Sequence, residues 1–413
     1  MPVPHRYLVA SDVETFVRER CFAPAQHGQV GIELERHLVS SDRAAAGIDH
    51  HALHGAVADL DPLPGGSLVT FEPGGQLELS SPPRPGPSAA CAVVTADLAV
   101  VDPVVEGFGI ELAAVGLHPD GHQELVVRGP RYDAMAAYLD HGGPCGRTMM
   151  CGTAALQVNL DIGEESVQAF RWRLAHQLGP VLLAAFANSP ICVGKHKGWR
   201  SGRAAAWAGI DPSRTLPAAD GAEDPAAAWL RYALDARVML IRSSEARYEP
   251  ILSPLTFAHW LEAGHDLGFP TLDDFEYHLG TLFPPVRGRG WLELRMVDAL
   301  PDPWWTAAAA VCAALLDDPE AADEADRATR RTAGLWSEAA RHGPAHPQLA
   351  TAARSCFAAA TDALPRMEAD AATIDAVVTF GERFVERGRC PADEVLDHTG
   401  PASTDRPLEV SRR

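Results

Sequence analysis

The sequence contains no Cys-x-x-Cys pair, and its eight cysteines are scattered from Cys21 to Cys390. A chain of 413 residues can bury a large core without disulfide bonds, so we expect these thiols to be reduced and mostly buried. Cys145 and Cys151 lie close together in the sequence, and a zinc site there is the less favoured interpretation.

The sequence also lacks an apolar run that approaches the ~20 residues of a membrane span. Its first residues, Met-Pro-Val-Pro-His-Arg, lack the charged-then-apolar plan of a signal peptide, so we expect a cytoplasmic protein without a membrane partner. Basic residues are scarce, because 35 Lys and Arg face 55 Asp and Glu and leave a formal net charge of -20. We therefore expect no nucleic-acid partner, since phosphate backbones are bound by basic surfaces.

Two common catalytic motifs are missing. The sequence has no Gly-x-x-x-x-Gly-Lys-Ser/Thr, so we do not expect a P-loop enzyme, and it has no Gly-x-Ser-x-Gly elbow. A single core usually stops growing beyond roughly 250 to 300 residues. We expect a main domain at 1–300, an Ala-rich helical appendage packed on it at 301–390, and a disordered polar tail at 391–413.

The most informative stretch runs from Val30 to Val39 and predicts a strand. With the two-residue period of a strand, Ile32 and Leu34 fall on one face and Glu33 and Glu35 on the other. Two carboxylates then point the same way, about 7 Å apart. Many amphipathic strands turn such a face to water, so this stretch alone leaves that interpretation open.

Three later stretches repeat the pattern of one apolar and one polar face. They are 67–83, where Pro73, Gly74 and Gly75 predict a hairpin or bulge with Glu72 at its lip, 156–162 and 291–297. The polar faces of the four strands together carry Glu33, Glu35, Gln76, Glu78, Gln157, Asn159, Asp161, Glu293 and Arg295. Five carboxylates with one arginine would be an unusual surface to expose to solvent, so we expect these faces to line a cleft.

Carboxylates that crowd into a cleft repel one another, and bound divalent cations relieve that repulsion. Oxygen ligands favour Mg²⁺ or Mn²⁺, which proteins commonly bind together with the phosphates of a nucleotide. Arg295, with Arg147, Arg200 and Arg203, could supply forked donors for phosphate or carboxylate. The basic run at 194–207 is equally consistent with a solvated surface. The histidines at 50, 51 and 54 are a less favoured metal site.

Four motifs in the expected strands resemble those of glutamate-cysteine ligases. They are Gly-Ile-Glu-Leu-Glu (31–35), Phe-Glu-Pro-Gly-Gly-Gln-Leu-Glu-Leu-Ser (71–80), Met-Met-Cys-Gly-Thr-Ala-Ala-Leu-Gln-Val-Asn-Leu-Asp (149–161) and Leu-Glu-Leu-Arg-Met-Val-Asp (292–298). The chain is most similar to the plant-like bacterial branch, which includes the ligase that makes gamma-glutamylcysteine for ergothioneine biosynthesis. The resemblance implies an α+β fold, a glutamine-synthetase-like curved antiparallel sheet that forms a cup flanked by helices.

The resemblance also implies an ATP-dependent reaction of L-glutamate with L-cysteine through a gamma-glutamyl phosphate. It implies metal-binding acids at Glu33, Glu35, Glu72, Glu78 and Glu293, catalytic roles for Arg295 and Glu293, and substrate or nucleotide contacts at Gln157, Asn159, Arg147, Arg203 and Arg295. We expect Mg²⁺ or Mn²⁺ as cofactor, and a monomer or weak homo-oligomer. A ligase of the same fold with another amine acceptor, a member that binds metal or nucleotide without catalysis, and a sheet that faces water stay open as alternatives.

Overall fold

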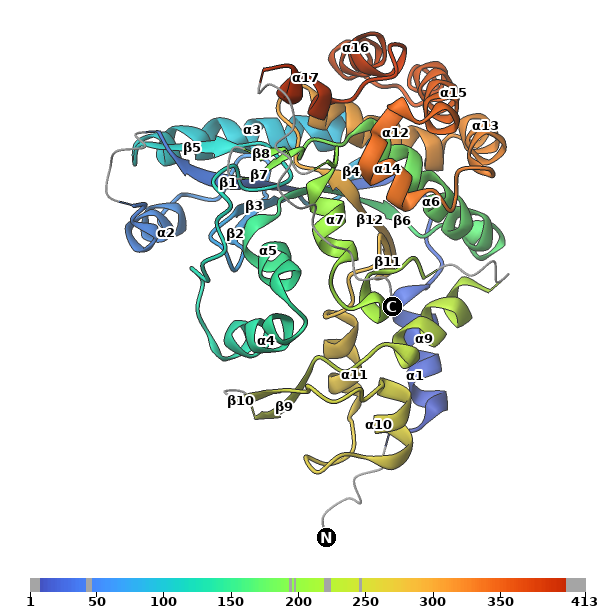
Figure 1. Ribbon diagram of the computed structural model, residues 1–413. Coiled ribbons are helices and arrows are strands. Elements are labelled where there is room, and N and C mark those ends of the chain that lie inside the picture. Colours follow the sequence, from blue (N-terminus) through green and yellow to red (C-terminus); the bar gives the residue numbers. More distant parts are fainter. Residues whose placement is uncertain are drawn as a thin grey trace.

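The computed structural model describes residues 8–41, 47–192, 195–196, 198–218, 224–244 and 247–398. An antiparallel sheet lies at its centre, with the strand order β11-β12-β6-β1-β3-β2, and β4 and β5 also pair with β1 (Figure 1). Its strands are β1 (Gln29–Ser40), β2 (Leu68–Phe71), β3 (Leu77–Ser80), β4 (Arg84–Pro85), β5 (Ile110–Ala113), β6 (Ala155–Asp161), β11 (Val286–Gly288) and β12 (Trp291–Asp298). Two small hairpins pair β7 (Ile191–Cys192) with β8 (Lys195–His196) and β9 (Leu240–Ser244) with β10 (Arg247–Pro250).

Helices cover both sides of the sheet. In Figure 1, α3, α12, α13, α15 and α16 lie above the sheet, whereas α4, α5, α10 and α11 lie below it. The first part of the chain forms α1 (Ala10–Phe16), α2 (His50–Ala58), α3 (Gly86–Glu106), α4 (Pro130–His141), α5 (Pro144–Gly152), α6 (Glu165–Ala185), α7 (Gly202–Ala208), α8 (Pro212–Thr215), α9 (Pro225–Asp235), α10 (Phe257–Ala263) and α11 (Leu272–Leu279). The last part forms α12 (Trp304–Asp317), α13 (Pro319–Thr329), α14 (Trp336–His342), α15 (Pro347–Ala363), α16 (Ala371–Phe380) and α17 (Pro391–Asp397).

The four amphipathic stretches predicted as strands are neighbours in this sheet, as β12, β6, β1 and β3. The expected hairpin at 67–83 is also present, because β2 and β3 pair on either side of the segment 72–76. An antiparallel sheet with helices on both sides confirms the predicted α+β fold class.

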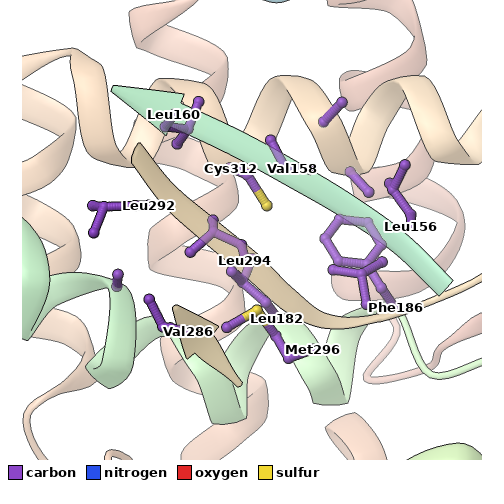
Figure 2. Packing of buried hydrophobic residues seen from close by; sticks show 14 of the residues in the cluster. Leu156, Val158, Leu160, Leu182, Phe186, Val286, Leu292, Leu294, Met296 and Cys312 are labelled. Atoms are coloured by element: carbon purple, nitrogen blue, oxygen red, sulfur yellow. The ribbon is translucent and has the colours of Figure 1, made fainter. Parts of the chain in front are cut away.

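The apolar face of the sheet forms the centre of the hydrophobic core. Val158 of β6 and Leu294 of β12 are fully buried, and Figure 2 shows them close to Leu182 of α6, to Phe186 directly after this helix, and near Cys312 of α12. The period of two predicted these inward residues correctly. Because one face of the strands is anchored in the core, the alternate residues must all point to the opposite face.

Helix α3 corrects one expectation from the sequence. By length and composition this 21-residue helix is apolar enough to cross a membrane, although no run of that kind was expected. In the structure α3 packs against β1 and α12, and Val94, Val101 and Val105 on it are fully buried. One face of α3 therefore packs in the protein core, while other apolar residues, such as Val100, are exposed.

The helices after residue 300 join the same core as the sheet. Leu315 of α12, Leu349 of α15 and Phe380 of α16 belong to the hydrophobic cluster that contains the strand residues Leu156 and Leu294. The division into domains at 1–300 and 301–390 stays a prediction. The expected disordered tail at 391–413 begins with helix α17, and residues 399–413 lie outside the described part of the chain.

Candidate active site

The polar face of the sheet lines a cavity of about 330 Å³. Strands β1, β3, β6, β11 and β12 supply one wall, and residues of α4, α5 and α7 supply the other. Seven of the residues predicted from the sequence line this cavity, namely Glu33, Glu35, Glu72, Gln76, Glu78, Gln157 and Arg295. The expectation that the polar faces meet in a cleft is therefore confirmed.

Strand register explains why these side chains meet. Glu35 of β1 lies opposite Glu78 of β3, and Glu33 of β1 lies opposite Gln157 of β6. Directly opposed residues of antiparallel strands point to the same face, about 4.5 to 5.5 Å apart at Cβ. The acids that are far apart in the sequence thus become close neighbours on one surface.

Glu72 reaches the cavity through the turn between β2 and β3. The turn is closed by bonds from Glu72 N to Gln76 O (2.8 Å) and from Gly75 N to Glu72 O (2.7 Å). Gly75 has a φ of +86°, and a Cβ on Gly74 would lie 2.1 Å from the backbone oxygen of Cys151. Only glycines fit at these two positions, one for its backbone conformation and one for its close approach to α5.

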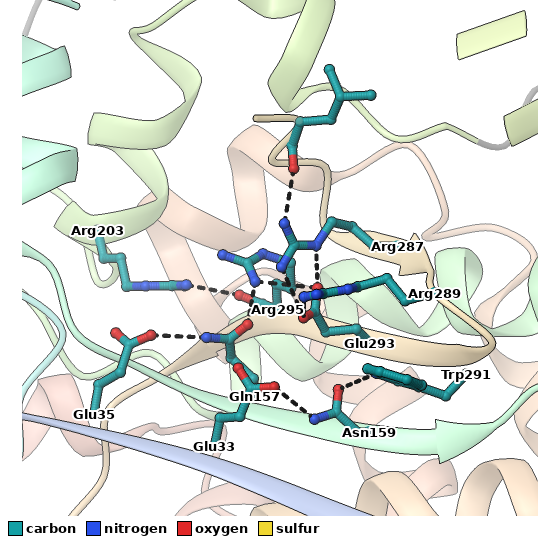
Figure 3. A network of polar contacts seen from close by, with 11 residues as sticks. Glu33, Glu35, Gln157, Asn159, Arg203, Arg287, Arg289, Trp291, Glu293 and Arg295 are labelled. Atoms are coloured by element: carbon teal, nitrogen blue, oxygen red, sulfur yellow. Dashed lines mark hydrogen bonds and ion pairs between the residues drawn. The ribbon is translucent and has the colours of Figure 1, made fainter. Parts of the chain in front are cut away.

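Amides of β6 hold the two carboxylates of β1 in place. Asn159 Nδ2 donates to Glu33 Oε1 (2.9 Å), and Gln157 Nε2 donates to Glu35 Oε1 (2.9 Å), as Figure 3 shows. The second oxygen of Glu35 accepts a bond from Ala155 N (2.8 Å). Asn159 does not line the cavity, and its predicted role is reduced here to orienting Glu33.

Glu293 differs from the other acids because arginines surround it. It is completely buried, and its oxygens accept bonds from Arg287 (one at 2.8 Å and a shorter one), Arg289 (3.2 Å) and Arg295 (3.2 Å). Figure 3 shows the three guanidinium groups around this carboxylate. A metal ion could reach Glu293 only if at least one of these contacts were broken.

The pKa values separate the same two groups of acids. Desolvation, with repulsion from neighbouring carboxylates, raises the pKa of Glu33, Glu78 and Glu72, in the last case to about 8. Desolvation likewise raises the pKa of Glu35, although Arg203 and Arg295 oppose it. Burial also opposes ionisation of Glu293, but Arg287 and Arg295 outweigh it and hold its pKa well below the usual range. The cavity acids are therefore crowded, whereas Glu293 is neutralised by arginine.

Arg295 lies between this cavity and a second one. The second cavity has about 600 Å³ and is mostly apolar, and Arg295, Trp207 and Phe283 line both. Arg295 Nη1 donates to Gln157 Oε1, its guanidinium lies 5.5 Å from the Trp207 ring, and its Nε has no partner among the described residues. Arg203 lines only the second cavity, where it lies 5.4 Å from the same ring.

Arg147 is not brought to either cavity. It lies on α5, and its guanidinium forms two hydrogen bonds with Asp140 of α4, one of them 3.0 Å from Nε to Oδ1. The basic run at 194–207 is only partly described, because residues 194 and 197 lie outside the described ranges. Of the two arginines of this run that could supply forked donors, Arg203 lines the apolar cavity, whereas Arg200 pairs with Asp393 and lines neither cavity.

Sequence reasoning missed several residues of the cavity, including Arg131, Tyr132, Trp207 and Arg287. Arg131 lies over the rings of Tyr132 and Tyr277, and no carboxylate of the described residues forms an ion pair with it. One feature of the sequence could have identified Arg131 and Tyr132. They are a basic and an aromatic residue that directly follow Gly129 and Pro130, where a helix begins. Arg287 lies on a strand of three residues, which is too short to show a period.

A metal site is not preformed in this geometry. Among the residues that the structure describes, no three Asp, Glu, His or Cys side chains are close enough together to hold a metal ion. The alternative sites at His50, His51 and His54 and at Cys145 and Cys151 gain no support from the structure for the same reason. The raised pKa values of four cavity carboxylates still fit a site that gains a cation together with its ligand.

Comparisons with known proteins find one matching family and several relatives of similar length. The family model described as "Glutamate-cysteine ligase family 2(GCS2)" matches residues 29–408. Glutamate-cysteine ligase EgtA of Mycolicibacterium smegmatis is 40% identical over 401 residues, which cover 96% of this chain and 93% of that protein. EgtA of Mycobacterium tuberculosis is 38% identical over 394 residues, 94% of this chain and 90% of that protein.

More distant proteins match as well. The chloroplastic glutamate-cysteine ligase of Brassica juncea is 34% identical over 247 residues, which cover 58% of this chain and 47% of that protein. A crystal structure of glutamate-cysteine ligase from Francisella tularensis in complex with AMP is 14% identical, with a TM-score of 0.49 and coverage of 91% of this chain and 85% of that chain.

Proposed function

Because this chain belongs to glutamate-cysteine ligase family 2, we propose that it joins the gamma-carboxylate of L-glutamate to the amine of L-cysteine at the expense of ATP. The gamma-carboxylate attacks the terminal phosphorus of ATP, which releases ADP and forms gamma-glutamyl phosphate. The amine then attacks the acyl carbon, phosphate leaves, and the amine loses a proton. The dipeptide product, gamma-glutamylcysteine, serves ergothioneine biosynthesis.

One observation carries this proposal most directly. Glu33, Glu35, Glu72 and Glu78 converge on a single cavity of about 330 Å³, and Arg295 lines the same cavity. A surface that only faced water would not collect four carboxylates whose pKa values are raised by burial and, to a smaller extent, by their mutual repulsion. The arrangement suits a ligand that arrives with compensating positive charge, such as a magnesium nucleotide.

We assign the four cavity carboxylates to one or more divalent cations, Mg²⁺ or Mn²⁺. Mg²⁺ typically takes one or two carboxylates and completes its shell with water and substrate phosphates, which agrees with a site that is not preformed. When bound, the cation would neutralise charge on phosphate oxygens and carboxylates. Glu293 joins these ligands only if Arg287 or Arg295 releases it, and otherwise it orients Arg295.

The arginines have complementary tasks in the proposal. Arg295, oriented by Gln157 and Glu293, faces the cavity and is assigned to the phosphate that is transferred. Arg131, which has no carboxylate partner among the described residues, is assigned to the alpha-carboxylate of an amino acid substrate. Together they bind and orient the reactants, so that positioning and charge neutralisation supply the catalysis.

A different amine acceptor is the second candidate. The apolar cavity beside Arg295, about 600 Å³ in volume, offers more room than the side chain of cysteine needs. An acceptor with a larger apolar side chain could extend into it past the packed rings of Trp207 and Phe283, which line both cavities. The chemistry would be unchanged, and only the identity of the amine would differ.

The proposed function is tested by phosphate release from ATP in the presence of Mg²⁺ and L-glutamate. The acceptor is varied from L-cysteine through 2-aminobutyrate and alanine to serine, valine and phenylalanine, and the products are identified by mass spectrometry. We expect the highest kcat/KM with L-cysteine. Preference for a larger apolar amine would favour the second candidate, and the absence of glutamate-dependent phosphate release with every amine would overturn both.

A further inference from the structure

Asp298 occupies the carboxyl end of β12, three residues after Arg295, and its side chain is completely buried. Its carboxylate accepts three hydrogen bonds, from Asn188 N (2.8 Å), Ser189 Oγ (2.6 Å) and Ser201 Oγ (2.9 Å). A buried carboxylate requires partners of this kind, because an unpaired charge in the core is strongly unfavourable. None of the three donors carries a charge, so the compensating charge must come from elsewhere.

That charge belongs to Arg203, which is 4% exposed. Arg203 Nη1 lies 3.9 Å from Asp298 Oδ1, and Arg203 Nη2 donates to the backbone oxygen of Arg295 (2.8 Å). Figure 3 shows the guanidinium of Arg203 reaching from α7 to Arg295. One guanidinium therefore links the buried carboxylate to the backbone of the arginine assigned to phosphate.

The backbone at Arg295 needs this support because the sheet does not provide it. The pairing of β12 with β6 shifts its register between Leu294 and Val297, so Arg295 and Met296 lie outside the regular ladder. Arg295 N bonds to Pro285 O (2.9 Å), and its carbonyl accepts the bond from Arg203. A bulge of this kind aims a side chain away from the regular pattern and depends on contacts from outside the ladder.

The position of the carboxylate itself is tightly fixed. Asp298 packs directly against Gly116, since a Cβ on that glycine would lie 2.6 Å from Asp298 Cγ, so only glycine leaves room for the carboxylate. Ser189 and Ser201 each bind a different oxygen of Asp298, and Ser201 also caps α7, the helix that carries Arg203. Asp298 thus connects the end of β12 with the start of α7.

We propose that Asp298 is a positioning residue for the ligase reaction, which orients Arg203 and through it the bulge of β12 that presents Arg295 to the two cavities. The inference rests on the proposed function and adds a residue that contacts neither substrate nor metal. Its charge is the essential property, because the hydrogen bonds from the serines hold the carboxylate but do not orient a guanidinium.

The test compares two nearly isosteric substitutions in buried Asp–Arg pairs. Asp298→Asn removes the charge that faces Arg203, and we expect kcat/KM to fall by roughly 10- to 100-fold, the usual cost of losing a group that orients a ligand-binding side chain. Asp317→Asn is the matched control. The Asp317 side chain is only 3% exposed and pairs with Arg171 (2.7 Å), but neither residue lines either of the two cavities. We expect it to lower the Tm and leave kcat/KM within about twofold.

A double-mutant cycle separates positioning from general destabilisation. If Asp298 acts through Arg203, the double variant Asp298→Asn/Arg203→Met should be no slower than Arg203→Met alone. Multiplication of the two single effects would overturn the inference, as would near-normal kcat/KM in Asp298→Asn. Ser189→Ala keeps the charge of Asp298 but removes the bond to its carboxylate and the bond that Ser189 Oγ accepts from Arg203 N (3.1 Å). It replaces Asp298→Asn if that variant does not fold, and we expect a smaller drop in the same direction because Arg203 is less firmly held.

Failure of the proposed function can be distinguished from failure of the positioning role of Asp298. It would appear as no glutamate-dependent phosphate release in the unaltered protein, before any variant is compared. In that case the fluorescence of Trp207, obtained as the difference from a Trp207→Phe form, reports on Arg203 and Arg295 together, because both guanidinium groups lie over that ring. A change in this signal in Asp298→Asn but not in Asp317→Asn would support the positioning, and an unchanged signal in both would overturn it.

Discussion

The two faces of the central sheet are made by alternate residues of the same strands, and they have opposite effects on stability. On one face Ile32, Leu34 and Val158 are buried against helices that lie on the side of the sheet opposite the cavity. On the other face Glu33, Glu35 and their neighbours crowd into a cavity, where burial and mutual repulsion raise their pKa values. The apolar face stabilises the fold, and the polar face costs stability that a bound ligand can restore.

Three of the four cavity carboxylates, Glu33, Glu35 and Glu78, lie on strands rather than on loops. A residue on the polar face cannot rotate away from the cavity, since a change of register by one residue would expose its apolar neighbours. The crowded carboxylates are therefore held together by burial of the opposite face. A rigid scaffold of this kind maintains a charge arrangement that would otherwise disperse.

Loss of one cavity carboxylate should give the largest effect. Glu33→Gln or Glu78→Gln removes a proposed cation ligand, and we expect kcat to fall by roughly 100-fold or more, as for other groups that stabilise transition-state charge. The Tm should stay the same or rise, because one repulsive charge is gone. The matched control is Glu111→Gln, an exposed carboxylate on β5, which should leave kcat unchanged. Near-normal rates in both cavity variants would refute the site.

A substitution on the apolar face of the sheet should lower stability and leave kcat nearly unchanged. Leu160→Ala opens a cavity behind β6, and we expect a loss of about 2 to 5 kcal/mol of unfolding free energy, measured by urea titration. The kcat of the folded fraction should stay within about threefold of the original, because the polar face keeps its carboxylates. Leu68→Ala, at a leucine that is 70% exposed, is the control and should change stability little. A large loss of kcat without loss of stability would contradict the division of roles.

Stability in the absence of metal should depend on pH in an unusual direction. A carboxylate whose pKa is raised on folding binds more protons in the folded state, so stability falls as the pH rises between the two pKa values. For Glu72 this window runs from 4.5 to about 8. We expect the Tm in EDTA to decrease from pH 5 to pH 8.5, and Mg²⁺ with nucleotide to restore it at the upper end. Glu72→Gln should flatten this slope, and an equal slope in both proteins would contradict the assignment.

The smallest effect is expected at Arg147. It lies on neither face of the sheet and pairs with Asp140 on the protein surface, where an ion pair contributes roughly 0 to 1 kcal/mol. We expect Arg147→Ala to change kcat/KM by less than about twofold and the Tm only slightly. Arg295→Lys is the useful contrast, since it keeps the charge but loses the forked donors in the cavity. A large loss in Arg147→Ala would show that the resemblance placed this residue correctly and that the structure does not explain its role.

The sequence predicted those parts of the fold in which periodicity and burial coincide. Ile32, Leu34 and the residues of β6 and β12 alternate with polar neighbours, so their faces were assigned correctly before the structure was known. Pro73, Gly74 and Gly75 predicted the hairpin because glycine serves a positive φ or a close approach of two backbones. The sequence predicted a helix rich in Ala and Val over the stretch that forms α3, but no apolar run of membrane-span length was expected there, because Asp97 and Asp102 interrupt its apolar residues.

The features of the site that the sequence did not predict depend on contacts between segments that are distant in the chain. The arginines around Glu293 could not be foreseen, because Arg287 lies on a strand of three residues that pairs with β12 only in the folded protein. Arg147 was expected in the site, but its position on α5 directs it to Asp140 of the preceding helix. Strand order, helix packing and partner choice of this kind are set by the tertiary fold rather than by local pattern.

The central claim is that one face of the sheet binds a nucleotide together with divalent cations. Anomalous diffraction from crystals grown with Mn²⁺ and a non-hydrolysable ATP analogue tests it directly. We predict anomalous peaks within bonding distance of carboxylate oxygens of Glu33, Glu35, Glu72 or Glu78, with the phosphates of the analogue on the same ions. Peaks elsewhere on the molecule, or a cavity that stays empty at saturating Mn²⁺ and analogue, would contradict the account.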